Sequence, residues 1–163
     1  MLKPILFIAI LFLTSCGTTT YYVVRHAEKA APTANMTSDV PLSEEGKQRA
    51  EALKDVLSGR KIQHIYSTNT IRTTATAKPL SEAIAVPIQL YDLKDSAFAK
   101  QIKALPKGNV LIVGHSNTVD DIVYGITGRK LFADLNDNQY GDLFIIVRKG
   151  KKRFEFTQSH FGK

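Results

Sequence analysis

Sulfur is nearly absent from this chain. Cys16 is the only cysteine among 163 residues, so an internal disulfide and a metal site built on cysteines are both excluded. The histidines provide no metal motif either, because none of them stands at an H-x-x-x-H or HExxH spacing. We therefore expect neither a metal nor another cofactor in this protein.

Acidic residues are also scarce. The chain has 15 Asp and Glu against 22 Lys and Arg, which gives a formal net charge of +7. A positive chain favours anionic partners, such as phosphates, nucleic acid or anionic lipid, without choosing among them. The length and the hydrophobic content of 44% suit one domain with a buried core.

No hydrophobic run is long enough to span a bilayer, which takes roughly 20 apolar residues. The longest run, Ile5–Leu13, follows Lys3 and precedes small residues, as in a secretory signal. The segment "LTSC", Leu13–Cys16, resembles the bacterial lipoprotein box, which implies cleavage before Cys16 and acylation of that cysteine. An ordinary secretory signal with an incidental cysteine is the alternative.

This reading divides the chain into three parts. Residues 1–15 are a lipoprotein signal peptide, residues 16–20 are the lipidated Cys16 and a short tether, and residues 21–163 are one domain. The predicted location is the bacterial cell envelope, with a lipid anchor on the periplasmic or outer-membrane face. Nucleic acid is not an expected partner of an exported protein.

Apolar strands alternate with amphipathic helices in the rest of the sequence. Such alternation predicts an α/β fold, a three-layer α/β/α sandwich around a mostly parallel sheet. We expect a kink or a restart at Pro79 in the second helix. The expected strands are 21–24, 64–67, 86–91 and 109–115, the helices are 43–58, 70–83, 96–105 and 118–127, and a closing hairpin joins 142–149 to 153–160.

Polar side chains fit for an oxyanion follow the ends of these strands. Arg25 and His26 end the first strand, Arg72 opens the second helix, and His115 ends the buried strand "NVLIVGH". Ligands of parallel sheets bind at the carboxyl ends of the strands. Imidazole supplies a nucleophile and arginine neutralises phosphoryl oxygens, so these four residues predict phosphoryl-transfer chemistry that requires no metal.

Four segments, in order, resemble motifs of the histidine phosphatase superfamily, which has the phosphoglycerate-mutase-like fold. The chain most resembles the small phosphohistidine-phosphatase-like members. The segments are "RHAEK" (25–29), "PLSEEGKQRAEAL" (41–53), "YSTNTIRTTATA" (66–77) and "VGHSNTV" (113–119).

The resemblance implies a role for each matching residue. His26 becomes the nucleophile that forms a phosphohistidine, Arg25 and Arg72 clamp the phosphoryl oxygens, and His115 donates to them. The proton donor is expected just after the third strand, where Asp92 is the first candidate. Asp95 and Glu28 are the other two candidates.

The implied function is a metal-independent phosphatase acting on a phosphomonoester or a related phosphoryl compound, either a small molecule or a phosphoprotein. One alternative is a phosphoglycerate-mutase-type phosphotransferase, which needs a lid that this compact sequence offers only in loop 27–41. The other is a non-catalytic phosphate-binding module of the envelope. The sequence chooses neither the substrate nor the oligomeric state.

Overall fold

The computed structural model describes residues 18–32, 39–92, 95, 97–106, 108–150 and 153–163. The described strands form one six-stranded sheet in the order β3-β2-β4-β1-β5-β6. Strands β3, β2, β4 and β1 are parallel, and β5 and β6 close the sheet as an antiparallel hairpin. The mostly parallel sheet is thus confirmed. The strand bounds are β1 Thr19–Arg25, β2 Ile62–Thr68, β3 Ile88–Tyr91, β4 Asn109–Gly114, β5 Asp142–Lys149 and β6 Arg153–His160.

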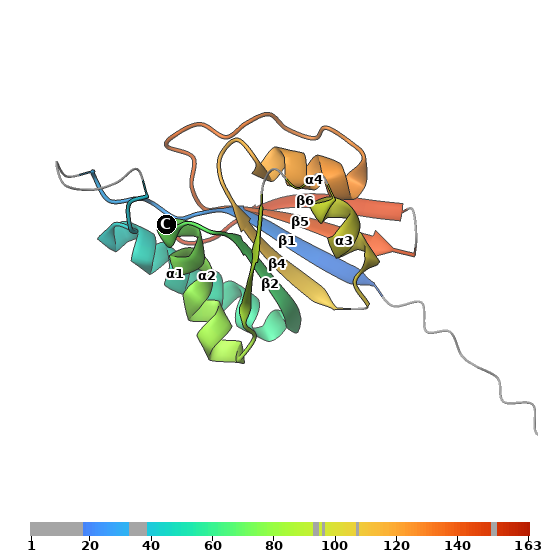
Figure 1. The fold of residues 1–163 in the computed structure, drawn as a ribbon, viewed down its shortest axis with the longest axis horizontal. Helices are drawn as coiled ribbons and strands as arrows, with labels where there is room; N and C mark the ends of the chain where they lie inside the picture. Colours follow the sequence, from blue (N-terminus) through green and yellow to red (C-terminus); the bar gives the residue numbers. More distant parts are fainter. Residues whose placement is uncertain (1–17, 33–38, 93–94, 96, 107, 151–152) are drawn as a thin grey trace, which may run out of the picture.

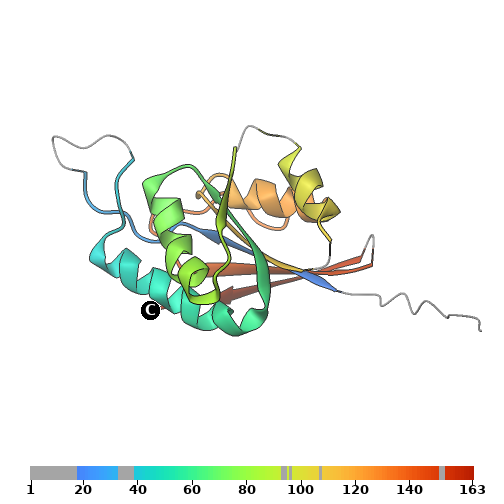
Figure 2. The same cartoon turned by 60° about the horizontal axis from the view of Figure 1, so that its bottom comes forward.

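Helices cover both faces of the sheet, as the three-layer prediction requires. Figures 1 and 2 show α1 and α2 on one face and α3 and α4 on the other. Ser43 caps α1, because its Oγ accepts a hydrogen bond from the Gly46 amide at 3.1 Å. The helix bounds are α1 Glu44–Leu57, α2 Ile71–Ile84, α3 Phe98–Ala104 and α4 Val119–Thr127, with a 3-10 turn η1 at Ser58–Arg60.

The apolar run of β1 supplies side chains to two separate cores. Tyr21 and Val23 are fully buried against the α3 and α4 side, whereas Tyr22 and Val24 are buried against the α1 and α2 side. Successive residues of a strand point to opposite faces. A central strand between two helical layers must therefore be apolar at every position until it reaches the edge of the sheet, where Arg25 stands.

Two local predictions need correction. The second helix runs unbroken through Pro79 rather than restarting there, and the buried side chains of Ala77 and Leu80 pack on either side of the proline. Strand β1 begins at Thr19, so two residues assigned to the tether belong to the sheet. The Thr20 amide donates to Asn109 Oδ1 at 3.0 Å, and Arg148 Nη2 donates to Thr19 Oγ1 at 3.2 Å.

The predicted signal peptide, and Cys16 with it, lies outside the described residues. Across the part of the chain that is described, no helix has the length and apolar character to cross a membrane.

The first turn of α1 packs directly on the backbone that follows the end of β1. A Cβ atom at Gly46 would lie 2.1 Å from the Glu28 carbonyl oxygen, so only glycine permits this approach. The same carbonyl oxygen accepts a hydrogen bond from the Ser43 amide at 2.9 Å. The start of α1 therefore fixes the loop that carries His26.

Candidate active site

The four residues singled out in the sequence converge at the carboxyl edge of the parallel strands. Arg25 is the last residue of β1 and His26 follows it, His115 follows β4, and Arg72 lies in the first turn of α2. The imidazole rings of His26 and His115 meet edge to face, with centroids 5.4 Å apart. Both guanidinium groups bear on this pair, since the charges of Arg25 and Arg72 each lower the pKa of both histidines.

His26 is held in one tautomer with its other nitrogen free of a proton. Its side chain is buried, and its Nδ1 lies 2.8 Å from the Ala27 carbonyl oxygen. A carbonyl oxygen only accepts, so Nδ1 carries the hydrogen and Nε2 keeps its lone pair. Burial, followed by the neighbouring cations, lowers the pKa of His26 from 6.5 to about 3. The imidazole is thus neutral at physiological pH, with a lone pair on Nε2.

His115 is bonded at both ring nitrogens. Arg72 Nη2 lies 3.4 Å from its Nδ1, and Thr68 Oγ1 lies 2.9 Å from its Nε2. Because a guanidinium only donates, Nδ1 accepts and Nε2 donates to Thr68. Burial, and then the charge of Arg72, lowers the pKa of His115 to about 4. The Thr68 hydroxyl in turn donates a hydrogen bond to Thr73 Oγ1 at 3.0 Å.

Arg72 is positioned by an acidic residue from a distant loop. Asp39 Oδ1 accepts from Arg72 Nη1 at 3.3 Å, and the Asp39 carboxylate also accepts from the Ile71 amide at 3.0 and 3.1 Å. One carboxylate therefore holds both the guanidinium and the start of α2. The Nε–H of Arg72 is buried and has no hydrogen-bond partner among the described residues.

Arg25 is held by the loop that precedes β5. Its Nη1 donates to three carbonyl oxygens, those of Asn136, Asp137 and Gln139, at 2.7, 3.1 and 3.0 Å. Its guanidinium carbon also lies 4.2 Å from the centroid of the Tyr140 ring, a favourable cation–π contact. Burial lowers the pKa of Arg25, and its Nε–H is, like that of Arg72, unpartnered in the described structure.

The three candidate proton donors occupy different surroundings. Glu28 is paired with Arg49, whose Nε lies 2.7 and 2.8 Å from its two oxygens. Asp95 accepts from the Ala97 amide at 2.8 Å and from Gln101 at 3.2 Å, next to the start of α3. Asp92 lines an open cavity of about 570 Å³ together with His115.

Sequence reasoning missed several residues of this site. Thr68, Asp39 and Tyr140 all contact predicted site residues. Thr68 lies inside the matching segment 66–77, so the motif itself could have indicated it. Tyr140 and the carbonyls around it follow no motif, and only the fold brings them to Arg25. Among the described residues, no three His, Cys, Asp or Glu side chains are grouped to hold a metal ion.

Comparison with known proteins agrees with this geometry. Residues 21–95 match the model of the histidine phosphatase superfamily (branch 1), so the resemblance read from the motifs is confirmed. No curated protein sequence matches the chain.

Solved structures show the same fold at low sequence identity. The protein histidine phosphatase SixA, complexed with tungstate, has a TM-score of 0.68 at 16% identity, covering 86% of this chain and 96% of that one. A mycobacterial glucosyl-3-phosphoglycerate phosphatase has a TM-score of 0.62 at 12% identity, covering 88% of this chain and 98% of that one. Phosphoglycerate mutase from Plasmodium falciparum has a TM-score of 0.60 at 20% identity, covering 86% of this chain and 89% of that one. The predicted phosphoglycerate-mutase-like fold is confirmed.

The lowered pKa values predict that both site histidines stay uncharged in mildly acidic solution. At pH 5.5 the imidazoles of His26 and His115 should be neutral in the folded protein, because their pKa values are about 3 and about 4. Nitrogen chemical shifts of the imidazoles, followed by NMR from pH 8 to 4, measure this. The urea-unfolded chain is the control, in which the same residues should titrate near 6.5. Midpoints near 6.5 in the folded protein would contradict the geometry.

The same shifts predict how stability depends on pH. Below about pH 6.5 the unfolded chain takes up protons on both imidazoles, whereas the folded chain does so only near pH 4 and below. The unfolded state then binds more protons, so the free energy of unfolding falls as the pH drops from 7 towards 4. Urea denaturation at several pH values should show a smaller loss for His26→Asn and for His115→Gln than for the wild type. Equal losses in all three proteins would refute the prediction.

Proposed function

Because residues 21–95 match the model of the histidine phosphatase superfamily (branch 1), we propose that this chain is a phosphatase working through a phosphohistidine at His26. Its substrate is a phosphomonoester or a related phosphoryl compound. The observation that carries the proposal is the state of His26, a buried and neutral imidazole with an unprotonated Nε2 next to His115 and two arginines. A nucleophile of that kind inside a cationic pocket suits a phosphoryl dianion.

In the first step Nε2 of His26 attacks phosphorus and the bond from phosphorus to the leaving oxygen breaks. The leaving oxygen takes a proton from the carboxyl group of Asp92, which shares a cavity with His115. The unpartnered Nε–H groups of Arg25 and Arg72 are donors for the phosphoryl oxygens. Such donors stabilise the charge that spreads over those oxygens in the transition state.

In the second step water attacks the phosphohistidine. Asp92, now ionised, takes a proton from that water, the bond between nitrogen and phosphorus breaks, and inorganic phosphate leaves. His26 returns to its neutral form with the hydrogen still on Nδ1, because the Ala27 carbonyl holds it there throughout. The net reaction consumes one water and releases one alcohol and one phosphate.

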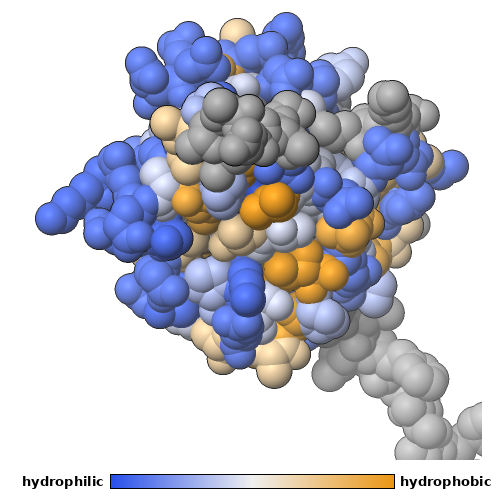
Figure 3. Space-filling model, turned by 60° about the vertical axis from the view of Figure 1, so that its left-hand side comes forward, coloured by the Kyte–Doolittle hydropathy of each residue, from blue (hydrophilic) through white to orange (hydrophobic). Residues whose placement is uncertain are grey.

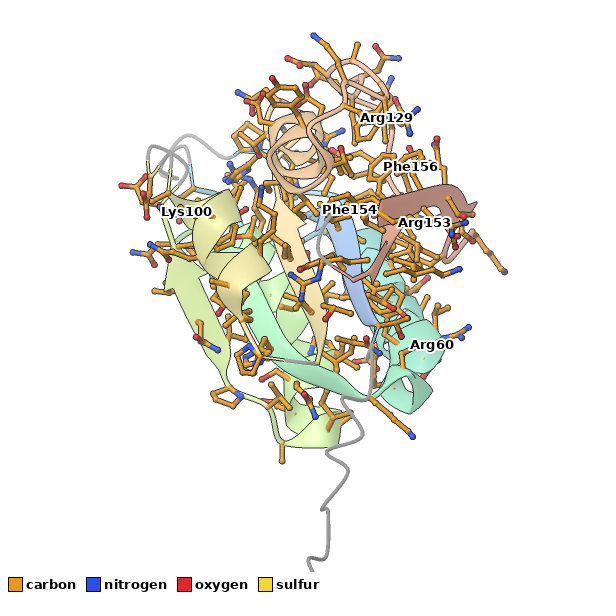
Figure 4. The ribbon with its side chains drawn as sticks, turned by 90° about the vertical axis from the view of Figure 1, so that its right-hand side faces the viewer. Arg60, Lys100, Arg129, Arg153, Phe154 and Phe156 are labelled. Atoms are coloured by element: carbon orange, nitrogen blue, oxygen red, sulfur yellow. The ribbon has the colours of Figure 1, made fainter. Side chains whose placement is uncertain are left out.

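We also propose that acyl chains on Cys16 anchor the protein in the bacterial cell envelope. Strand β1 begins three residues after Cys16 and runs for seven residues, roughly 20 Å, before it delivers His26. Figure 4 views the side of the domain at which β1 starts, with Arg60, Arg129 and Arg153 spread over it. These exposed cations suit an anionic membrane surface, and the site would then face away from it.

We expect His26→Ala to abolish hydrolysis of p-nitrophenyl phosphate by the full chain. Arg72→Ala should lower kcat/KM by about 10²- to 10³-fold, because it removes charge-assisted donors. Acid-labile, alkali-stable phosphate should be trapped on the wild type and not on His26→Ala. The matched control is His160→Ala, whose imidazole is exposed. Retained turnover in His26→Ala would overturn the proposal, and phosphoryl transfer to a second substrate molecule rather than to water would favour the mutase alternative.

The leaving group tests Asp92. An alkyl phosphate needs a proton on its departing oxygen, whereas p-nitrophenolate departs without one. Asp92→Asn should therefore slow alkyl phosphates by about 10²- to 10⁴-fold and p-nitrophenyl phosphate far less. Asp55→Asn, on the distant end of α1, is the control. Equal slowing of both substrates by Asp92→Asn would exclude it as the proton donor.

Acylation is tested by labelling. When the chain is expressed in bacteria with radioactive palmitate, the wild type should carry label and Cys16→Ser should carry none. Ser15→Ala keeps a small residue before the cysteine and should be labelled like the wild type. An unlabelled wild type would leave an ordinary secretory signal as the explanation of the N-terminal segment.

A further inference from the structure

A second hollow adjoins the candidate active site. The cavity beside His115 and a groove of about 290 Å³ between α3 and α4 share Tyr91 and Asp92 as lining residues. The groove therefore lies next to the cavity beside His115, with the proposed proton donor Asp92 at the border of the two. The described lining of the groove consists of Tyr91, Asp92, Asp95, Phe98, Ala99, Thr118, Asp121, Ile122, Tyr124 and Gly125.

The walls of this groove are apolar and fixed in place. The rings of Tyr91 and Phe98 stack with centroids 4.0 Å apart and an interplanar angle of 7°. The Tyr91 hydroxyl donates to the Val113 carbonyl at 3.2 Å, which orients the ring. Leu90 and Tyr124, at the mouths of the two hollows, are 56% and 55% exposed. Figure 3 shows hydrophobic residues among hydrophilic ones on the side where the parallel strands end.

The charge of the groove is opposite to that of the chain. The net charge of the chain is +7, yet Asp95 and Asp121 line the groove besides the proposed proton donor Asp92, and neither hollow has a lysine or arginine among its described lining residues. The Asp95 side chain accepts hydrogen bonds from the Ala97 amide and from Gln101. Arg72 contacts His115 Nδ1 at 3.4 Å, but neither Arg25 nor Arg72 is among the described lining residues of the two hollows.

We propose that this groove binds the leaving-group part of the substrate, and that this part has an apolar body and a positive charge. The inference rests on the proposed phosphatase function and extends it to the substrate class. The arginines of the site attract the phosphoryl end of the substrate, and the acidic residues of the groove attract its cationic end. The bond to the leaving oxygen would then lie between them, beside Asp92. Contact with Tyr91 and Tyr124 buries apolar surface of the substrate, which stabilises the bound state more than a small charged group alone would.

The experiment compares two aryl phosphates on the full-length wild-type chain. Tyramine phosphate carries an ammonium group and 3-(4-phosphonooxyphenyl)propanoate carries a carboxylate, on side chains of similar length. Their phenol leaving groups have similar reactivity, so the ratio of the two kcat/KM values reports recognition of charge. We expect the cationic substrate to be preferred by about tenfold at low salt. The preference should shrink in high salt, because salt screens exposed charges.

Variants of the groove locate the effect. Asp121→Lys should bring the ratio close to one, and Tyr124→Ala should raise KM for both phosphates while leaving the ratio in place. Asp55→Lys makes the same charge change on α1 and is the matched control, with the wild-type ratio expected. Thermal unfolding of each variant checks that it is folded.

The outcomes separate the two proposals. Equal use of both phosphates, or preference for the anionic one, with turnover still dependent on His26, overturns the inference and leaves the phosphatase standing. A preference that persists unchanged in Asp121→Lys overturns the assignment to this groove. Absence of turnover and of phosphorylated His26 overturns the phosphatase, and the inference with it.

Discussion

The pairing of β1 with β4 is the constraint on which the candidate site depends. Arg25 stands opposite Gly114 in the parallel register, and the His26 amide donates to the Gly114 carbonyl at 2.9 Å. This bond places the residue after β1 beside the residue after β4, so the two imidazoles meet at the edge of the sheet. A shift of one residue in this register would turn one of the two strands over with respect to the two cores. The hydrophobic pattern that buries β1 therefore also sets the distance between His26 and His115.

Around this pair the structure combines positive charge with uncharged imidazoles. Two arginines alone would attract phosphate, but a protonated histidine among them would have no lone pair to offer. Burial and the arginines act together to keep both histidines neutral. The Ala27 carbonyl and Arg72 then fix which nitrogen of each ring carries the hydrogen. The same cations that would attract a phosphoryl group thus help to keep the His26 imidazole neutral, with a lone pair on Nε2.

The sequence was sufficient for the sheet, its layers and the four converging residues, because each depends on a local pattern. Apolar runs locate the strands, and side chains at strand ends meet at one edge. The partners of those residues depend on long-range contacts without a local pattern: Tyr140 meets Arg25 across more than a hundred positions, and Asp39 reaches Arg72 from another loop. The pairing of Glu28 with Arg49 is likewise visible only in the fold.

Arg49 also links the loop that carries His26 to the segment that follows the edge strand β6. Besides Glu28 it binds the Phe161 carbonyl at 3.0 Å and the Lys163 carbonyl at 2.7 Å, just beyond the end of β6. Glu28 is two residues from His26, so the Arg49 and Glu28 side chains together join the segment after β6 to the loop that carries His26. A partner that binds β6 or displaces it from the sheet would therefore act, through Arg49 and Glu28, on the loop that carries His26.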